Sequence, residues 1–392
     1  MISFEEASAI VLGQSMSLRE ERVSLSESPG RVLAEDIFTD IDFPPFNKSA
    51  VDGFACRMDD LAHPGDFRIV ETIAAGKIPR KAIGRHECSK IMTGAMVPEG
   101  AGCVVMVEDS EMTGDGRVRF TNTPVSPNVC YRGEDLRAGD LVLEKGLKIK
   151  ASHVAVLAGV GAAHPMVAAL PRVAIISTGD ELVEPSVKPG MSQIRNSNGW
   201  QLEAQLRVLP ALAFNLGIAR DEGTSLRHII DLGLLDHDVV LLTGGVSMGE
   251  FDHVPGILKE AGVEILFEKV AIQPGKPTVF GRKGNTFVFG LPGNPVSSFV
   301  LFEILVKPFL NRMMGHTEQP VVFQLPMGVD YTRRRSDRKS MIPVVIRDGA
   351  VYPVEYHGSA HINAYTKAGG IMVVETGTTR ITRGEQVHVR PL

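Results

Sequence analysis

Three glycine-rich turns, each directly after a strand-like run, constrain the fold of this sequence more than any other feature. Glycine lets the backbone approach a ligand closely, and a helix that begins there points free N–H groups at an anion. The turns are residues 177–181, 243–249 and 290–295, and the runs before them are residues 172–176, 238–242 and 285–289. Three such turns on one parallel sheet predict a binding site for a phosphorylated ligand.

The sequence changes character near Pro171. Before it, short Val-rich segments alternate with Gly, Pro and Asp turns, which is typical of all-β modules. From 172 to 312 strands alternate with helix-length stretches, which predicts βαβ units and a mostly parallel, layered sheet. The expected helices are residues 200–209, 225–235, 253–261 and 296–314. After Gly315 short strands return, indicating a small terminal β domain, and Ser3 with Glu6 forms a capping box that opens an N-terminal helix.

Composition limits the class of protein. A chain of 392 residues suggests two to four domains, and 44% apolar with 22% charged residues is typical of a soluble globular protein. The net charge of −5 gives no reason to expect nucleic acid or an anionic membrane as a partner. The stretch 154–170 is broken by His164-Pro165, so we expect a buried helix and a strand there rather than a membrane span. The N-terminus lacks the positive region of a signal peptide, and the four scattered cysteines predict reduced thiols of a cytoplasmic protein.

Acidic residues accompany the first two turns. Asp180 and Glu181 end the first, and Glu250 and Asp252 follow the second. Carboxylates beside an anion site are unfavourable unless a cation lies between them, which suggests a Mg²⁺-type ion. The alternative is that these acids cap helix N-termini. We favour that alternative for Asp180 or Glu250 alone, and a metal or phosphate role for Glu181 together with Asp252.

A further segment carries two lysines. Lys269 and Lys276 frame a Pro-Gly turn and could supply charge to a phosphate or another oxyanion. The segment is not a Walker A loop, because Pro277 stands where that motif has Ser or Thr. An ordinary type II turn is the alternative for this segment. Polar turns at 42–54, 93–95 and 132–135 would each be read as a loop without further context.

Taken in order, these motifs closely resemble the molybdopterin molybdenumtransferase family, which is related to the C-terminal domain of gephyrin. The similarity runs essentially end to end. Each motif is modest alone, but the ordered set is specific. The matching motifs are Pro44-Pro45-Phe46 through Asp52-Gly53, Thr93-Gly94-Ala95, Gly133-Glu134-Asp135, and residues 177–182, 244–249, 274–277 and 291–295.

The resemblance implies a multidomain α/β plus β fold and a homodimer. The expected parts are an N-terminal helix region at 1–26 packing with the α/β domain, a small β linker domain at 27–44 and 139–170, a mixed α/β lid domain at 45–138, a three-layer parallel-sheet molybdopterin-binding α/β domain at 171–316, and a C-terminal β domain at 317–392. The implied cleft lies between the α/β domain of one subunit and the mixed domain of the other.

The resemblance also implies a reaction, in which molybdate is inserted into adenylylated molybdopterin with Mg²⁺ and AMP is released. The implied catalytic residues are Asp52, Thr93 and Asp135 from the mixed domain and Glu181, Asp221 and Asp252 from the α/β domain. Of these, Glu181 and Asp252 are the implied metal ligands, and a helix cap explains Asp221 equally well. The implied cofactor-binding residues are Thr178, Gly179, Gly244, Gly245, Ser247, Gly249, Lys269, Lys276, Pro292, Gly293, Asn294 and Pro295.

Three positions depart from the commonest family pattern. Gln273 stands where many members carry Lys, and His253 and Phe54 each replace a frequent Tyr. We expect altered molybdate affinity rather than lost activity. Candidate protein partners are the molybdopterin adenylyltransferase and apo-molybdoenzymes.

Two other functions remain open from the sequence. Adenylylation of molybdopterin by ATP would need only the α/β domain and would leave the residues before 171 unexplained. A non-catalytic scaffold, as gephyrin partly is, fits poorly with the intact acids Asp52, Glu181 and Asp252.

Overall fold

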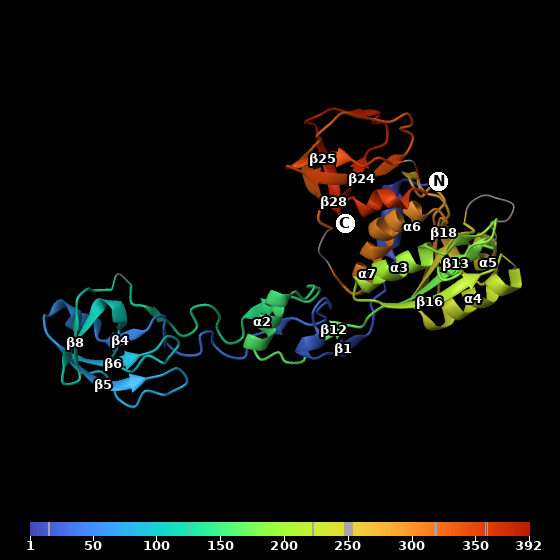
Figure 1. Ribbon diagram of the computed structural model, residues 1–392. Helices are drawn as coiled ribbons and strands as arrows, with labels where there is room; N and C mark the ends of the chain where they lie inside the picture. Colours follow the sequence, from blue (N-terminus) through green and yellow to red (C-terminus); the bar gives the residue numbers. More distant parts are fainter. Residues whose placement is uncertain are drawn as a thin grey trace. The chain divides into compact units, whose positions relative to one another are not determined.

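A computed structural model describes residues 1–392 except Ser15, Val125, Glu222, 247–253, 317–319, His357 and Ser359. The chain forms two compact units, whose elements are labelled in Figure 1. Unit 1 comprises Met1–Glu35, Lys145–Ala151 and His164–Leu392, and unit 2 comprises Asp36–Glu144 and Ser152–Ala163.

The central sheet of unit 1 is mostly parallel, as predicted. Its described strands, in spatial order, are β16 (Leu212–Ala219), β13 (Arg172–Thr178), β17 (Val239–Thr243), β21 (Thr286–Leu291), β20 (Val279–Lys283) and β18 (Glu264–Phe267). The first four run parallel, whereas β20 pairs antiparallel with both of its neighbours, β21 and β18. The antiparallel edge follows from the turn at Gly284, because so short a connection cannot join parallel strands.

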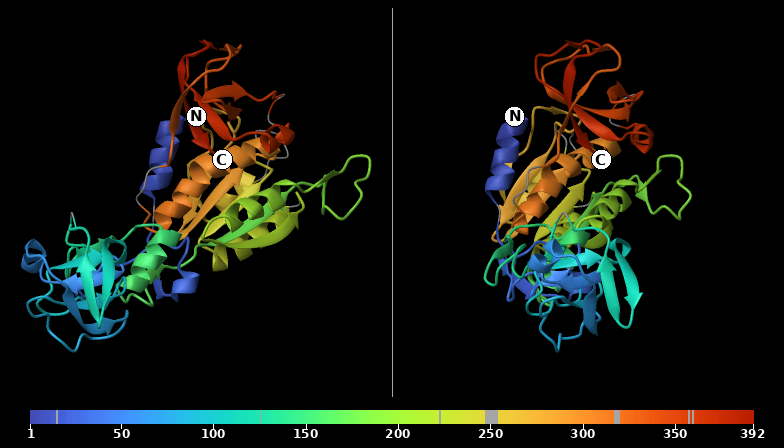
Figure 2. Two further views of the ribbon diagram at one scale, coloured as in Figure 1. Left: turned by 60° about the vertical axis from the view of Figure 1, so that its left-hand side comes forward. Right: turned by 90° about the vertical axis from the view of Figure 1, so that its left-hand side faces the viewer.

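Helices cover both faces of this sheet and complete three layers (Figures 1 and 2). Successive strand side chains point to opposite faces, so Val173 packs with α1 and α3 while Ala174 packs with α4 and α5. The helices of the first face are α1 (Phe4–Gly13), α3 (Asn198–Arg207) and α6 (Pro295–Leu301). Helix α6 continues through a π-helical turn, η4 (Phe302–Val306), into α7 (Lys307–Met313). The helices of the second face are α4 (Gly223–Asp236) and α5 (Val254–Glu260).

The N-terminal helix begins as predicted. The Ser3 hydroxyl accepts a hydrogen bond from the Glu6 N–H at 3.0 Å, and the Glu6 carboxylate accepts one from the Ser3 N–H at 3.0 Å. This capping box satisfies two backbone donors that would otherwise lack partners.

A second sheet lies in the C-terminal part of unit 1. Met341 and Ile371 from this sheet join the core of the first helical face. Its strands are β19 (Ile272–Gln273), β24 (Lys339–Arg347), β26 (Gly370–Val374), β28 (Gln386–Pro391) and β22 (Phe323–Pro326), with β25 (Ala350–Pro353) beside β24. The shorter elements of unit 1 are β1 (Glu20–Arg22) with β12 (Met166–Ala168), β14 (Leu182–Val183) with β15 (Ile194–Arg195), β23 (Tyr331–Thr332) with β27 (Arg380–Ile381), η1 (Leu25–Glu27) and η5 (Ile362–Thr366).

Unit 2 has its own sheet and its own core. The order of its strands is β7 (Cys103–Met106), β4 (Gly53–Cys56), β6 (Glu87–Ile91), β5 (Phe67–Ile73), β9 (Arg117–Phe120) and β8 (Ser110–Gly114). Smaller elements are β3 (Lys48–Ser49) with β10 (Val129–Cys130), β2 (Ile37–Phe38) with β11 (Leu141–Leu143), η2 (Met58–Ala62), η3 (Val107–Asp109) and α2 (Ala151–Gly159), whose first residue belongs to unit 1. Cys56, Cys88 and Cys103 are buried free thiols, as the composition predicts.

No helix in the described part of the chain is long and apolar enough to span a bilayer.

Candidate active site

The three glycine-rich turns meet in unit 1, where the parallel strands β13, β17 and β21 end. Together they line a cavity of about 700 Å³. The first two turns approach so closely that a side chain is excluded at Gly244, whose φ is +99°, because a Cβ there would lie 2.4 Å from the Thr178 carbonyl oxygen. A Cβ on Gly293 would lie in ordinary van der Waals contact with the Gly244 Cα, at 3.5 Å. These glycines therefore let three separate turns share one wall of the cavity.

Two asparagines before and at the start of α3 hold the turns in place. The Asn198 side-chain amide donates to the Thr243 hydroxyl at 2.9 Å and to the Gly293 carbonyl at 2.8 Å. The Asn196 side-chain oxygen accepts from the Ser177 hydroxyl at 3.0 Å and from the Gly199 N–H at 3.1 Å. Asn198 thus connects the second turn to the third, and Asn196 connects the end of β13 to α3.

Three buried polar atoms of this cavity lack a hydrogen-bond partner among the described residues. They are the Thr178 hydroxyl, the Asn196 amide nitrogen and the Asn198 amide oxygen, all on residues that line the cavity. A buried polar group without a partner costs about 1–3 kcal/mol. Such groups are rare in folded proteins, and all three belong to residues that line this one cavity.

Two carboxylates face the same cavity. Glu181 and Asp221 both line it, and the Glu181 side chain lies over the first turn, 2.5 Å from where a Cβ on Gly179 would be. Oxygen donors of this type suit Mg²⁺. Within the described ranges no group of three or more His, Cys, Asp or Glu is placed to hold a metal ion, and Asp252 lies outside them. Asp180 instead accepts the Asp221 backbone N–H at 3.2 Å, as a capping residue would.

The lysine segment reaches the cavity only through its proline. Pro277 lines the wall, whereas Lys269 and Lys276 do not. The two ends of the segment lie close together, because the N–H of Val270, which follows Lys269, donates to the Lys276 carbonyl at 3.0 Å. Gln273 lies in β19, opposite Ser340 of β24.

In unit 2, Asp52 and Thr93 form a hydrogen-bonded pair on the surface. One Asp52 oxygen accepts the Thr93 N–H at 2.6 Å and the Thr93 hydroxyl at 2.9 Å. Both hydrogen bonds lower the pKa of Asp52, and the bond from the Thr93 N–H contributes more than the bond from its hydroxyl. Asp135 is exposed, and its own N–H donates to the Phe43 carbonyl at 3.0 Å.

Three sequence profiles cover nearly the whole chain. They are the MoeA N-terminal region (domain I and II) at residues 2–161, the probable molybdopterin binding domain at 174–312, and the MoeA C-terminal region (domain IV) at 325–392. Curated proteins named molybdopterin molybdenumtransferase, from Staphylococcus epidermidis (strain RP62A) and Staphylococcus aureus (strain Mu50), are 34% identical over 99% of this chain and 95% of their own length. The chain belongs to the molybdopterin molybdenumtransferase family.

Solved structures agree with this assignment. A crystal structure titled as molybdopterin biosynthesis moeA protein from Pyrococcus horikoshii OT3 matches with a TM-score of 0.87 at 27% identity, covering 100% of both chains. A second, from Pyrococcus horikosii, has a TM-score of 0.83 at 31% identity and covers 100% of this chain and 99% of that one. The fold and the family predicted from the ordered motifs are therefore confirmed.

The structure brings most of the implied residues of unit 1 together around the cavity at the glycine-rich turns, with two groups of exceptions. The lysines lie outside its lining, and Ser247, Gly249 and Asp252 lie outside the described residues. Sequence reasoning missed Asn196 and Asn198 altogether. The run 196–199, Asn-Ser-Asn-Gly, directly before a helix could have indicated them, because such residues bind nearby backbone and cap helices.

Proposed function

We propose that this protein is a transferase of molybdenum cofactor biosynthesis that inserts molybdate into adenylylated molybdopterin and releases AMP. One observation carries the proposal. In a chain of this family, the three glycine-rich turns and the carboxylates of Glu181 and Asp221 line one cavity. We further propose a homodimer, as the resemblance implies, that works in the cytoplasm, as the scattered cysteines predict.

The residues of the cavity support distinct roles. Backbone N–H groups at Gly245 and Gly293 suit the phosphates of the substrate, because glycine allows close approach. The Thr178 hydroxyl and the two asparagine amides suit the polar edge of the pterin or its phosphate. Holding both reactants in one cavity accounts for much of the rate enhancement that such a reaction needs.

The carboxylates support magnesium binding. Glu181, one of the two metal ligands expected from sequence, offers carboxylate oxygens in the cavity beside those of Asp221. Asp252 is the other expected ligand. Bound Mg²⁺ would neutralise phosphate charge and make AMP a better leaving group. In unit 2, the two bonds from Thr93 favour the ionised form of Asp52, which suits it to accept a hydrogen bond or to bind a cation.

The test supplies adenylylated molybdopterin, molybdate and Mg²⁺ and measures AMP release and reconstitution of an apo-molybdoenzyme. We expect AMP release that depends on molybdate. No AMP release would refute the proposal, and adenylylation of free molybdopterin by ATP would support the adenylyltransferase instead.

Metal dependence is a separate prediction. EDTA should abolish AMP release, and added Mg²⁺ should restore it, because carboxylates alone would repel the substrate phosphates. The Asp252→Asn variant should lose AMP release yet still bind the pterin. Full activity of this variant, or of the enzyme in EDTA, would contradict the magnesium assignment.

A further inference from the structure

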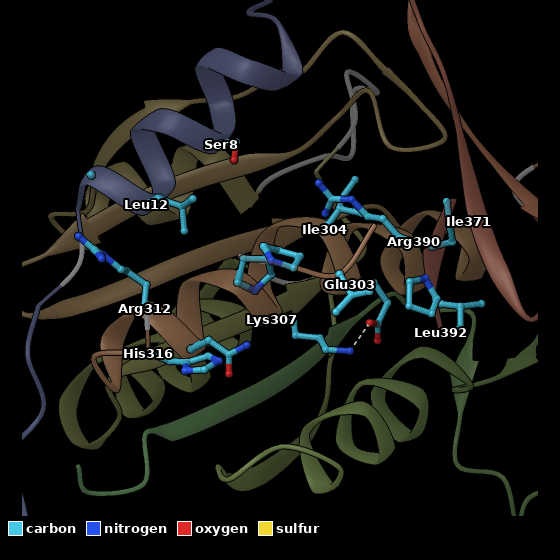
Figure 3. Close-up of a pocket in the computed structure, with 16 residues that line it drawn as sticks. Ser8, Leu12, Glu303, Ile304, Lys307, Arg312, His316, Ile371, Arg390 and Leu392 are labelled. Carbon is cyan, nitrogen blue, oxygen red and sulfur yellow. Dashed lines mark hydrogen bonds and ion pairs between the residues drawn. The ribbon is translucent and has the colours of Figure 1, made fainter. Parts of the chain in front are cut away.

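Unit 1 contains a second cavity, of about 680 Å³, bounded by α1, the α6–α7 helix, β26 and β28 (Figure 3). It shares no lining residue with the cavity at the glycine-rich turns. Its size is that of small-molecule sites in proteins.

Arg390 is the unusual residue of this cavity. Its side chain extends from β28 into the cavity beside Ile304 (Figure 3). The residue is largely withdrawn from solvent, and this burial lowers its pKa. In the part of the chain that the structure describes, no carboxylate lies within ion-pair distance of its guanidinium. Buried charges are normally paired because desolvation is costly, so this arginine lacks the anion that its surroundings call for.

The acidic side chain nearby does not supply that anion. Glu303 is the one acidic side chain among the described lining residues. It already accepts from the Lys307 ammonium at 2.8 Å and from the Gln205 amide at 2.8 Å. Arg312, on the same helix, adds a second cation to the lining. The side chains that line the cavity therefore carry an excess of positive charge.

The other residues that line the cavity indicate which groups a ligand would need besides an anion. Asn311 also lines the cavity, and its amide oxygen is buried without a partner among the described residues. Leu12, Ile304 and Ile371 form apolar walls against which a hydrocarbon or ring would be desolvated.

We propose that this second cavity binds a small organic anion, with a phosphate or carboxylate group paired to Arg390 and an apolar body against Leu12 and Ile304. A planar guanidinium recognises both groups through paired hydrogen bonds. The site is separate from the proposed reaction and does not depend on it.

The test uses the full chain and three probes that share one ring: phenyl phosphate, benzoate and neutral benzyl alcohol. Isothermal titration calorimetry should show saturable binding of at least one anion and none of benzyl alcohol. Hydrogen exchange should slow in α7 and β28 when the anion binds. Phenyl phosphate alone would identify a phosphate ester as the ligand type, and benzoate alone a carboxylate.

The Arg390→Met variant should bind the anion at least about tenfold more weakly, since a charge-assisted pair is lost. Its melting temperature should not fall, because a desolvated, unpaired charge is removed. Arg383→Gln, an exposed arginine outside the cavity, is the matched control and should bind like the parent. If Arg390→Met fails to fold, Arg312→Gln takes its place, with an expected loss of about threefold.

Three results would overturn the proposal. They are the absence of saturable binding by either anion, equal binding by benzyl alcohol, and undiminished binding by the folded Arg390→Met variant. The last would place the anion elsewhere, for example at the glycine-rich turns.

Discussion

Asn198 joins two of the three turns through a single amide group. Its nitrogen donates to the Thr243 hydroxyl and to the Gly293 carbonyl, and the residue is only 9% exposed. Replacing it with alanine removes both bonds and leaves the Gly293 carbonyl unsatisfied. We expect Asn198→Ala to lower the free energy of unfolding by about 2 kcal/mol and to weaken AMP release, measured by urea denaturation and the turnover assay. Asn122→Ala, on the surface of unit 2, should change stability by less than about 0.5 kcal/mol. Unchanged activity in Asn198→Ala would show that the turns keep their places without it.

The Asp52–Thr93 pair makes a prediction about pH. Because the pKa of Asp52 is lowered in the folded state, the pair stabilises the fold at neutral pH. That stabilisation is complete above the ordinary aspartate pKa of about 3.9 and is lost as the pH falls through the lowered pKa.

Thr93→Val removes the hydroxyl bond and keeps the backbone bond, so it should raise the pKa of Asp52 partway towards its ordinary value. NMR titration of the carboxyl carbon measures this shift. Thr93→Ser keeps the hydroxyl and should leave the pKa low, and equal pKa values in both variants would contradict the hydroxyl's role.

At the scale of elements, the site depends on how closely the loop after β17 passes the end of β13. Gly244 has a φ of +99°, and a Cβ there would press against the Thr178 carbonyl and hydroxyl oxygens at 2.4 and 2.8 Å. Gly244→Ala should therefore move the two turns apart, cost about 1–3 kcal/mol through backbone strain alone, and lower AMP release. Gly256→Ala is the matched control, because Gly256 lies exposed in α5 with nothing near a new Cβ. It should stabilise the protein by about 0.5–1 kcal/mol. Equal stability of the two variants in urea denaturation would show that the turns tolerate the added methyl group.

Local sequence predicted the elements that local forces determine. The runs that became β13, β17 and β21 are continuous apolar segments, as expected for strands buried on both faces. Ser3 and Glu6 lie three residues apart, so their capping box could be read directly. The run 196–199 could have indicated Asn196 and Asn198 as residues that bind nearby backbone. Their part in joining the turns could not be read, because the strand ends come together from distant parts of the chain. The same holds for Arg390, whose place in the second cavity is set by the packing of β28 beside the α6–α7 helix and α1.

At the scale of the whole molecule, each unit has cores of its own. Those of unit 2 draw on residues such as Phe67 and Ile91, and those of unit 1 on residues such as Phe309 and Val240. Units with separate cores can unfold as separate cooperative transitions. We therefore expect calorimetry to resolve two transitions in the full chain.

Two matched substitutions test this expectation. Phe67→Ala removes a ring that is 2% exposed and should cost about 3–5 kcal/mol, lowering the melting temperature of one transition only. Phe309→Ala, fully buried in unit 1, should lower the other. If both substitutions shift a single transition, the two cores unfold together.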